Sequence, residues 1–242
     1  MFSLTAIRRF IRVTLGVYLL AGIPLPAYAQ GGFSSGSTGA DGAFSPTTSQ
    51  TIQVPESGVF NYTTVNIPSN VTITYVRNAK NTPVTILASG NVTINGVILL
   101  SGVDGGANGG GGLGGPGGFN GGAGGFGFAG DVAGFGTAPF VGVTADGPGG
   151  GGGGGSVNGA DISGGGGGGY ALPGTNGGRA SVNAVAGQGG PRYGATTLLP
   201  LIGGSGGGGG GAITGQHGGA GGGGGGAILI ASSTTITMTG TI

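Results

Sequence analysis

A glycine block in the middle of the chain constrains the fold more than any other feature. Residues 102–226 hold 59 of the 70 glycines among the 242 residues. Glycine loses more backbone entropy on folding than any other residue, so this block stays disordered unless backbone hydrogen bonds offset the loss. Two alternatives remain open, a layered polyglycine-II-like bundle and a mobile loop. A collagen helix is excluded because the strict single-glycine period is missing.

Part of the glycine block has the repeat expected of polyglycine II. That helix has three residues per turn, so a G-G-x repeat keeps every x side chain on one edge while bare glycines face neighbouring helices. Residues 111–119 are G-G-x units, and the pattern resumes at residue 121 after Asn120. Elsewhere the repeat becomes pure glycine, in the runs 149–155, 164–169, 206–211 and 221–226.

Strand-like sequence flanks the glycine block on both sides. Residues 51–101 and 227–242 are rich in Val, Ile and Thr, with apolar residues at alternate positions. Residues 30–50 are rich in Gly, Ser and Thr without periodicity, which is typical of a flexible leader.

The strand-like regions contain a repeat of about 20 residues. Asn70–Ile73 and Asn91–Ile94 are the same N-V-T-I string, 21 residues apart. A third copy lies near the end of the chain, where Leu229–Ser232 resembles Ile86–Ser89. The string Ile236–Met238 then matches Val92-Thr93-Ile94 if one residue is inserted. Repeats of this length in β-branched sequence favour an all-β fold, a parallel β-helix or β-solenoid.

In a β-solenoid, corresponding residues of successive turns stack as inward ladders. One predicted ladder is Ile73, Ile94 and Met238, and another is Val71, Val92 and Ile236. The glycine block is then a long insertion between two turns. Residues 227–242 form a returning turn, which we expect to be truncated from a longer protein. The alternative is an antiparallel sandwich of short strands.

Residues 1–29 have the organisation of a secretory signal peptide. Three arginines precede an apolar run at Val13–Ile23, and Ala27-Tyr28-Ala29 offers the small-x-small pattern that a signal peptidase recognises. Cleavage between Ala29 and Gln30 is predicted. The alternative, a membrane anchor, is disfavoured because the apolar run is short for the hydrocarbon core and prolines follow it. We expect no membrane span after signal removal.

Charge and cysteine content exclude several classes of protein. Without the signal, four basic and six acidic residues remain, a net charge of −2, so no basic surface for nucleic acid is expected. The chain contains no cysteine, which excludes disulfides, zinc–thiolate sites and thiol nucleophiles.

No catalytic, cofactor or metal residue is predicted. His217 is the only histidine and has no carboxylate near it in sequence, and the acidic residues are isolated in turn-like sequence. A calcium nonapeptide begins at Gly124, but Ala129 stands where aspartate is needed and Asp131 comes two places late. The large aromatic residues of the block either pack on the flank of the solenoid or stand exposed as an adhesive or sugar-contacting surface; they are Phe119, Phe126, Phe128, Phe135, Phe140, Tyr170 and Tyr193.

Two strings carry a resemblance to a known group. With SGNVTING at 89–96 and GGGGGGAILIAS at 221–232, residues 51–242 resemble uncharacterised glycine-rich secreted bacterial proteins with a parallel β-helix-like core. The resemblance implies a β-helix-like fold and export, with no established activity and no functional residue to carry over. The glycine block is also similar in composition to the polyglycine-II domains of some phage adhesins and of an insect-like antifreeze protein.

We therefore expect a non-enzymatic, exported structural or adhesive protein of the bacterial cell envelope, secreted or held at the cell surface. Its expected partners are cell-surface glycans or other envelope components. Two alternatives are kept. One is binding of polysaccharide or ice by regular glycine-rich faces, and the other is a β-helix polysaccharide-active enzyme with its site outside this sequence.

Overall fold

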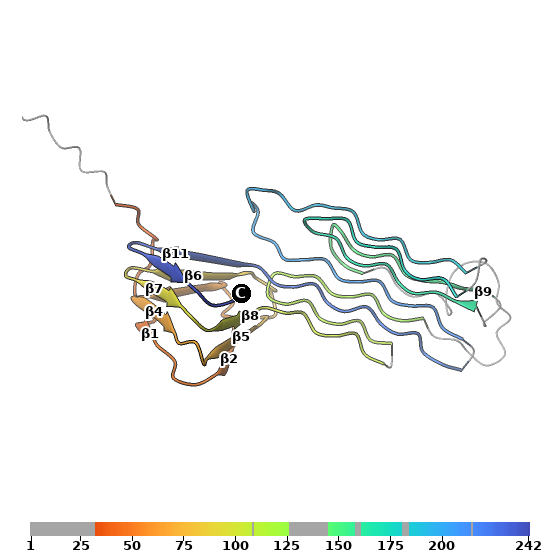
Figure 1. Cartoon of the computed structure of the whole chain (residues 1–242), viewed down its shortest axis with the longest axis horizontal. Helices are drawn as coiled ribbons and strands as arrows, with labels where there is room; N and C mark the ends of the chain where they lie inside the picture. Colours follow the sequence, from red (N-terminus) through yellow and green to blue (C-terminus); the bar gives the residue numbers. More distant parts are fainter. Residues whose placement is uncertain (1–31, 108, 126–144, 158–160, 181–183, 214) are drawn as a thin grey trace, which may run out of the picture. The chain divides into compact units, whose positions relative to one another are not determined.

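The described part of the chain is made of β-strands and loops, without a helix. The computed structural model describes residues 32–107, 109–125, 145–157, 161–180, 184–213 and 215–242 (Figure 1). Its strands pair in parallel, except for a short antiparallel pair of β9 (Ser156–Val157) with β10 (Asp161–Ile162). An all-β fold with parallel sheets is therefore confirmed. In these residues no helix has the length and hydropathy that crossing a membrane requires. The predicted signal peptide and its cleavage site, Ala29 and Gln30, lie outside the described residues.

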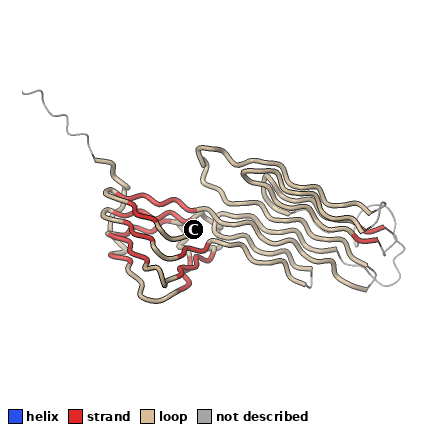
Figure 2. Tube along the Cα trace, viewed as in Figure 1, coloured by secondary structure: helices blue, strands red, loops and turns tan. Residues whose placement is uncertain are grey.

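The strands follow one another in successive layers (Figures 1 and 2). The first layer has β1 (Ala43–Phe44) and β2 (Gln50–Gln53), and the second has β3 (Val59–Tyr62), β4 (Thr64–Ile67) and β5 (Thr72–Val76). The third has β6 (Val84–Ala88), β7 (Val92–Ile94) and β8 (Val97–Leu99), and the fourth has β11 (Ile228–Ser232) and β12 (Ile236–Met238). Parallel pairing between layers builds three sheets, β1-β4-β7-β12, β2-β5-β8 and β11-β6-β3.

Alternation of apolar and polar residues in each strand builds the core. In β5 and β7 the apolar residues at every second position are buried, while the threonines between them remain partly accessible. Each buried valine or isoleucine contributes about 1.5–3 kcal/mol. The inward side chains are Val54, Phe60, Tyr62, Val65, Ile67, Val71, Ile73, Tyr75, Val84, Ile86, Ala88, Val92, Ile94, Ile98 and Leu100.

Aromatic rings fill the end of the core beside the first layer. Phe44 stacks on Tyr62 with ring centroids 5.0 Å apart, and Tyr62 stacks on Phe60 at 5.8 Å. Tyr75 packs against Phe60 at 5.4 Å. β1 has only two residues, so the first layer contributes few side chains to the core. The large aromatic rings fill the volume that more numerous aliphatic side chains fill in the later layers.

The expected pairing of the two ends of the strand region is confirmed. β12 lies parallel to β7, with Ile236 opposite Val92 and Met238 opposite Ile94. The β11 register differs by one residue from the expectation, because Ile86 lies opposite Ile230 and not Leu229. β11 and β12 both follow their partners at an offset of 144 residues, so no residue is inserted between them.

The 21-residue spacing of the N-V-T-I strings does not correspond to the step from one layer to the next, and the predicted ladders that join Ile73 to Ile94 and Val71 to Val92 are wrong. Ile73 lies opposite Ile98, whereas Ile94 lies opposite Ile67. Residues stacked between the second and third layers are 25 to 27 positions apart, as Ile73 with Ile98 and Ile67 with Ile94 illustrate. The two strings therefore occupy different sheets, and they are alike because each sheet requires the same alternation of inward and outward residues.

The segment expected to be a flexible leader takes part in the fold. β1 and the first residue of β2 belong to it, and β1 pairs with β4. Before β1, serine side chains bond to successive layers: Ser37 Oγ donates to the Tyr62 carbonyl at 2.7 Å, and Ser35 Oγ donates to the Ala88 carbonyl at 2.7 Å. The Ser35 amide also donates to Ser233 Oγ at 3.0 Å. This segment thus ties the second, third and fourth layers together.

The glycine-rich residues between β8 and β11 form extended segments joined by backbone hydrogen bonds. We call the described residues of 102–226 the glycine module. Its bonds advance in steps of three along both partners: Gly204, Gly207 and Gly210 donate to the carbonyls of Gly225, Gly222 and Gly219, at 2.7–3.0 Å. Other residues of the same run serve other neighbours, since Gly208 donates to Gly166 and Gly206 accepts from Gly151. A step of three is the period of a three-residue helix.

Close contact between segments explains most of the glycines. A Cβ atom at Gly209 would lie 1.9 Å from the Ala123 carbonyl oxygen, and one at Gly221 would lie 1.8 Å from that of Gly207. At every third position there is room: the nearest atom to a Cβ at Gly222 is 3.8 Å away, and Gly219 and Gly225 have none within 4 Å. Glycine is therefore required sterically at about two positions of three, as the G-G-x repeat predicts.

The neighbours Gly224 and Gly225 provide a matched test of this packing. A Cβ at Gly224 would lie 1.9 Å from the Gly204 carbonyl oxygen, whereas Gly225 is exposed. We expect Gly224→Ala to lower the free energy of unfolding by about 2 kcal/mol or more, and Gly225→Ala to leave it unchanged or raise it by about 0.4–1 kcal/mol. Denaturant unfolding of both variants measures this, and equal effects would contradict the packing.

Tyr75 provides a test of the core. Its side chain is 2% exposed, and its hydroxyl has no hydrogen-bond partner in the described structure. Tyr75→Phe removes the desolvated hydroxyl, so we expect equal stability or a gain of up to about 1 kcal/mol. Burial raises the pKa of Tyr75 above its usual value of 10.0. Ionisation above pH 10 therefore favours the unfolded wild type, and the advantage of the variant grows there. A stability loss at neutral pH would contradict this.

Candidate functional site

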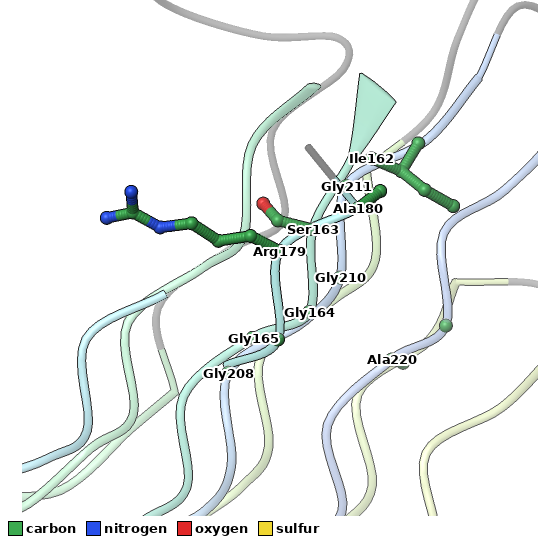
Figure 3. Close-up of a pocket in the computed structure, with 12 residues that line it drawn as sticks. Ile162, Ser163, Gly164, Gly165, Arg179, Ala180, Gly208, Gly210, Gly211 and Ala220 are labelled. Carbon is green, nitrogen blue, oxygen red and sulfur yellow. The ribbon is translucent and has the colours of Figure 1, made fainter. Parts of the chain in front are cut away.

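The glycine module contains a groove lined mainly by glycine (Figure 3). Its volume is about 440 Å³, within the range of small-molecule sites. One wall runs from Ile162 to Gly165 and from Gly178 to Ala180, and the remaining lining comes from Gly208, Gly210, Gly211, Gly219 and Ala220. Many of its peptide groups are already bonded to neighbouring segments: Gly164 donates to the Gly178 carbonyl, and Gly210 donates to the Gly219 carbonyl.

Two residues of this groove, Ser163 and Arg179, have polar side chains. The Ser163 hydroxyl accepts from the Gly155 amide and lies within donating distance of the carbonyls of Gly155 and Val185, so its single proton serves the packing of the segments. Arg179 is the charged residue of the lining, and Figure 3 shows its side chain pointing away from Ile162. The groove thus has no acid–base pair for proton transfer.

The titratable residues weighed in the sequence do not converge. His217 is exposed, and its Nδ1 lies 3.0 Å from the position of a Cβ at Gly109. Asp41 accepts a bond from the Asn61 amide at 2.6 Å, and Asp146 accepts one from the Asn120 side chain at 3.1 Å. In the described part of the chain, no three His, Asp or Glu side chains group closely enough to hold a metal ion. Asp131 and Ala129 lie outside the described residues.

The described aromatic residues of the glycine module pack against it. Tyr170 and Tyr193 form an edge-to-face pair with centroids 5.2 Å apart, and the Tyr193 hydroxyl donates to the Gly203 carbonyl. Phe119 is half-buried, and its ring would contact a Cβ at Gly147 at 2.6 Å. These three side chains therefore pack, through contacts within the glycine module rather than the predicted contacts with the flank of the solenoid. Phe126, Phe128, Phe135 and Phe140 lie outside the described residues.

The side chains with the most specific contacts lie where the layers meet the glycine module. Asn81 donates through Nδ2 to the Gly118 carbonyl at 2.6 Å and accepts from the Gly117 amide at 3.0 Å. Nearby, Arg77 Nη1 donates to Asn120 Oδ1 at 2.6 Å, and Asn120 in turn bonds Asp146. Sequence analysis missed this junction. The one sequence signal for the junction is Asn81, in the turn before Pro83. Asparagine tolerates a positive φ, and the φ of Asn81 is 51°.

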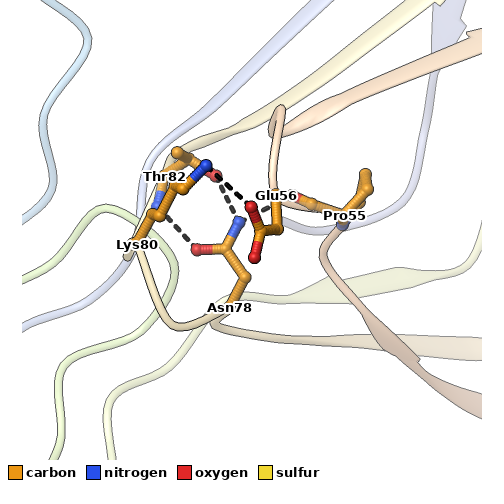
Figure 4. A network of polar contacts seen from close by, with 5 residues as sticks. All are labelled: Pro55, Glu56, Asn78, Lys80 and Thr82. Atoms are coloured by element: carbon orange, nitrogen blue, oxygen red, sulfur yellow. Dashed lines mark hydrogen bonds and ion pairs between the residues drawn. The ribbon is translucent and has the colours of Figure 1, made fainter.

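A polar network shapes the turn that carries Asn81 (Figure 4). Asn78 is 6% exposed and donates to the Pro55 carbonyl and to Thr82 Oγ1, each at 2.6 Å, while its Oδ1 accepts from the Thr82 amide. Lys80 and Glu56 form an ion pair at 2.7 Å, but their side chains are mostly exposed and contribute little to stability. The hydrogen bonds of Asn78 therefore fix the conformation of the turn, and in this conformation the Asn81 side chain bonds Gly117 and Gly118 of the glycine module.

Comparison with known proteins gives no relative. A scan against protein-family models finds no matching family, and searches of the curated proteins and of the solved structures find no significant match. The function has to be argued from the geometry above.

The junction is tested by two substitutions at Asn81. Asn81→Ala removes two hydrogen bonds and places alanine in a left-handed conformation, so we expect a loss of about 2–3 kcal/mol in the free energy of unfolding. Asn81→Gly loses the bonds but keeps the conformation, and recovers about 1 kcal/mol of that loss. Denaturant unfolding measures both. Lys80→Ala is the control, with an expected change below about 0.5 kcal/mol in the free energy of unfolding. If Asn81→Ala and Lys80→Ala had equal effects, Asn81 would not stabilise the junction.

Proposed function

We propose that the layers form a parallel β-solenoid and that residues 102–226 are an insertion between its third and fourth turns. The pairing of β11 and β12 with β6 and β7 supports the insertion, because strands separated by this block lie in adjacent layers. The steps of three in the hydrogen bonds support a polyglycine-II-like bundle for the glycine module rather than a loop.

On this architecture, the protein is a non-enzymatic, exported structural or adhesive component of the bacterial cell envelope. The solenoid is a rigid support and the glycine module is the element displayed on it. The proposal rests on the close packing of backbone segments in the glycine module. A side chain at Gly209 or Gly221 would collide with a carbonyl of a neighbouring segment. Such packing supplies a stiff surface with few chemical groups, which suits adhesion better than catalysis.

A second candidate function rests on one exposed edge of the glycine module. Gly219, Gly222 and Gly225 are exposed, and a Cβ at any of them would have room. Glycine is not sterically required at these three positions, yet it leaves a flat backbone face. The face repeats every three residues, which is about 9 Å in a helix with three residues per turn. This regularity favours binding of an ordered surface such as polysaccharide or ice.

A graft separates the contributions of the solenoid and the glycine module. Ser101 is equivalent to Val76 and Ile228 pairs with Val84, so the turn Arg77–Thr82, which connects β5 to β6, is the matched replacement for residues 102–226. We expect the graft to keep the β-sheet circular dichroism signal and to lose binding to bacterial cells, insoluble glycans and ice. The full chain is the positive control, and the Gly225→Ala variant is measured beside it as a test of the exposed edge.

The outcomes of this binding assay distinguish the candidates. Binding to cells that requires the module supports adhesion, and binding to purified glycan or ice that Gly225→Ala weakens supports the regular face. Binding that survives the graft would contradict display by the module. Turnover of a glycan by the full chain would contradict a non-enzymatic role.

A further inference from the structure

The segment before β1 crosses the layers through alternate serines. We call Phe33–Gly42 the serine strap. Its residues Ser37 and Ser35 donate through their hydroxyls to the carbonyls of Tyr62 and Ala88, each at 2.7 Å. Tyr62 and Ala88 are paired residues of β3 and β6, so the strap advances by one layer for every two of its residues. The strap therefore runs from the second layer toward the fourth.

A reciprocal pair of serines joins the strap to the fourth layer. The Ser35 amide donates to Ser233 Oγ at 3.0 Å, and the two hydroxyl oxygens lie 3.1 Å apart. Because the Ser35 hydroxyl gives its one proton to the Ala88 carbonyl, the Ser233 hydroxyl is the donor between the two oxygens. The Ser233 amide, directly after β11, also donates to the Ala88 carbonyl, at 3.0 Å. The strap and the fourth layer therefore meet at one carbonyl of the third layer.

Hydrogen bonds, and not buried side chains, hold the strap in place. Its one large apolar side chain, Phe33, is 68% exposed. Gly36 and Gly39 have φ of 77° and 71°, so ordering the strap restricts glycines that are free in the open state. A segment held in this way opens locally without unfolding the core. The other end of the strap is fixed, because the Asp41 amide donates to the Asn61 carbonyl at 2.9 Å and the Asp41 carboxylate accepts from the Asn61 amide at 2.6 Å.

β11 connects the contact with the strap to the glycine module. Ser233 follows this strand of five residues, and Gly226 lies at the start of it, two residues before Ile228. The Gly226 amide donates to the Leu100 carbonyl, and three residues earlier the Gly223 amide donates to the Val103 carbonyl. Separation of β11 from β6 would therefore remove the alignment on which the first bonds of the module depend.

We propose that the serine strap is a clasp, which opens and closes at Ser35 and, when closed, keeps β11 on β6 and the glycine module in register. The open strap leaves the core of the second and third layers intact but lets β11 separate more often. This proposal does not rest on the adhesive role, because it concerns the order of the glycine module and not what the module binds.

Hydrogen exchange of backbone amides in the full chain tests the clasp. Ser35→Ala removes the hydroxyl that bonds both Ala88 and Ser233, and we expect the amides of β11, Gly223 and Gly226 to exchange about tenfold faster. The matched control is Ser37→Ala, which removes an equally short bond of the strap but no contact with the fourth layer. The same amides should then exchange within about twofold of the wild-type rate. Adding Ser233→Ala to Ser35→Ala should change the rate little further, since the two hydroxyls act as a pair.

A disulfide provides a second measurement, in which the clasp is closed by a covalent bond. The chain has no cysteine, so Ser35→Cys/Ser233→Cys introduces one pair, at positions whose hydroxyl oxygens are 3.1 Å apart. We expect an intramolecular disulfide under mild oxidation, and slower exchange at Gly223 and Gly226 than in the reduced form of the same variant. Ser37→Cys/Ser233→Cys should stay reduced, because Ser37 bonds the second layer.

Four results would overturn the clasp. They are unchanged exchange of β11 in Ser35→Ala, an equal acceleration in Ser37→Ala, failure of the Ser35→Cys/Ser233→Cys disulfide to form, and equal exchange in the oxidised and reduced forms of that variant.

Discussion

The pairing of the fourth layer with the third is the interaction on which the rest of the structure depends. It holds both ends of the glycine-rich sequence at one place, since the Gly226 amide donates to the Leu100 carbonyl at 2.7 Å and the Gly223 amide donates to Val103 at 2.9 Å. These bonds set the outgoing and returning segments antiparallel and in register. The remaining segments of the glycine module bond to this pair and to one another. Backbone hydrogen bonds, rather than buried side chains, therefore offset the entropy that glycine loses on folding.

Sterics make the glycine module specific despite its simple composition. At Gly209, Gly221 and Gly224 a neighbouring carbonyl oxygen lies within 1.9 Å of the Cβ position, so no other residue fits without moving a segment. The same short approach brings Cα–H groups against carbonyl oxygens, which adds weak contacts to the N–H···O bonds. Asn81 and Asn120 complete the packing by substituting side-chain amides for peptide groups at the junction.

Because the glycine module is built mainly from backbone, the described residues offer few reactive side chains. Peptide groups that line the groove between Ile162 and Ala220 bond neighbouring segments, and Ser163 is engaged in holding segments together. The acidic residues Asp41 and Asp146 bond separate backbone and amide partners. A stiff body with uncharged faces suits contact with extended surfaces.

The sequence by itself determined that the chain is all-β with parallel strands, that Ile236 and Met238 return to Val92 and Ile94, and that glycine recurs at two positions of three. Local alternation and composition carry that information. The number of residues from one layer to the next was decided only by tertiary structure, because Asn70–Ile73 and Asn91–Ile94 suit any of the sheets equally well and pairing alone selects Ile67 for Ile94. The role of Asn81 was likewise invisible, since it depends on where Gly117 and Gly118 approach the turn.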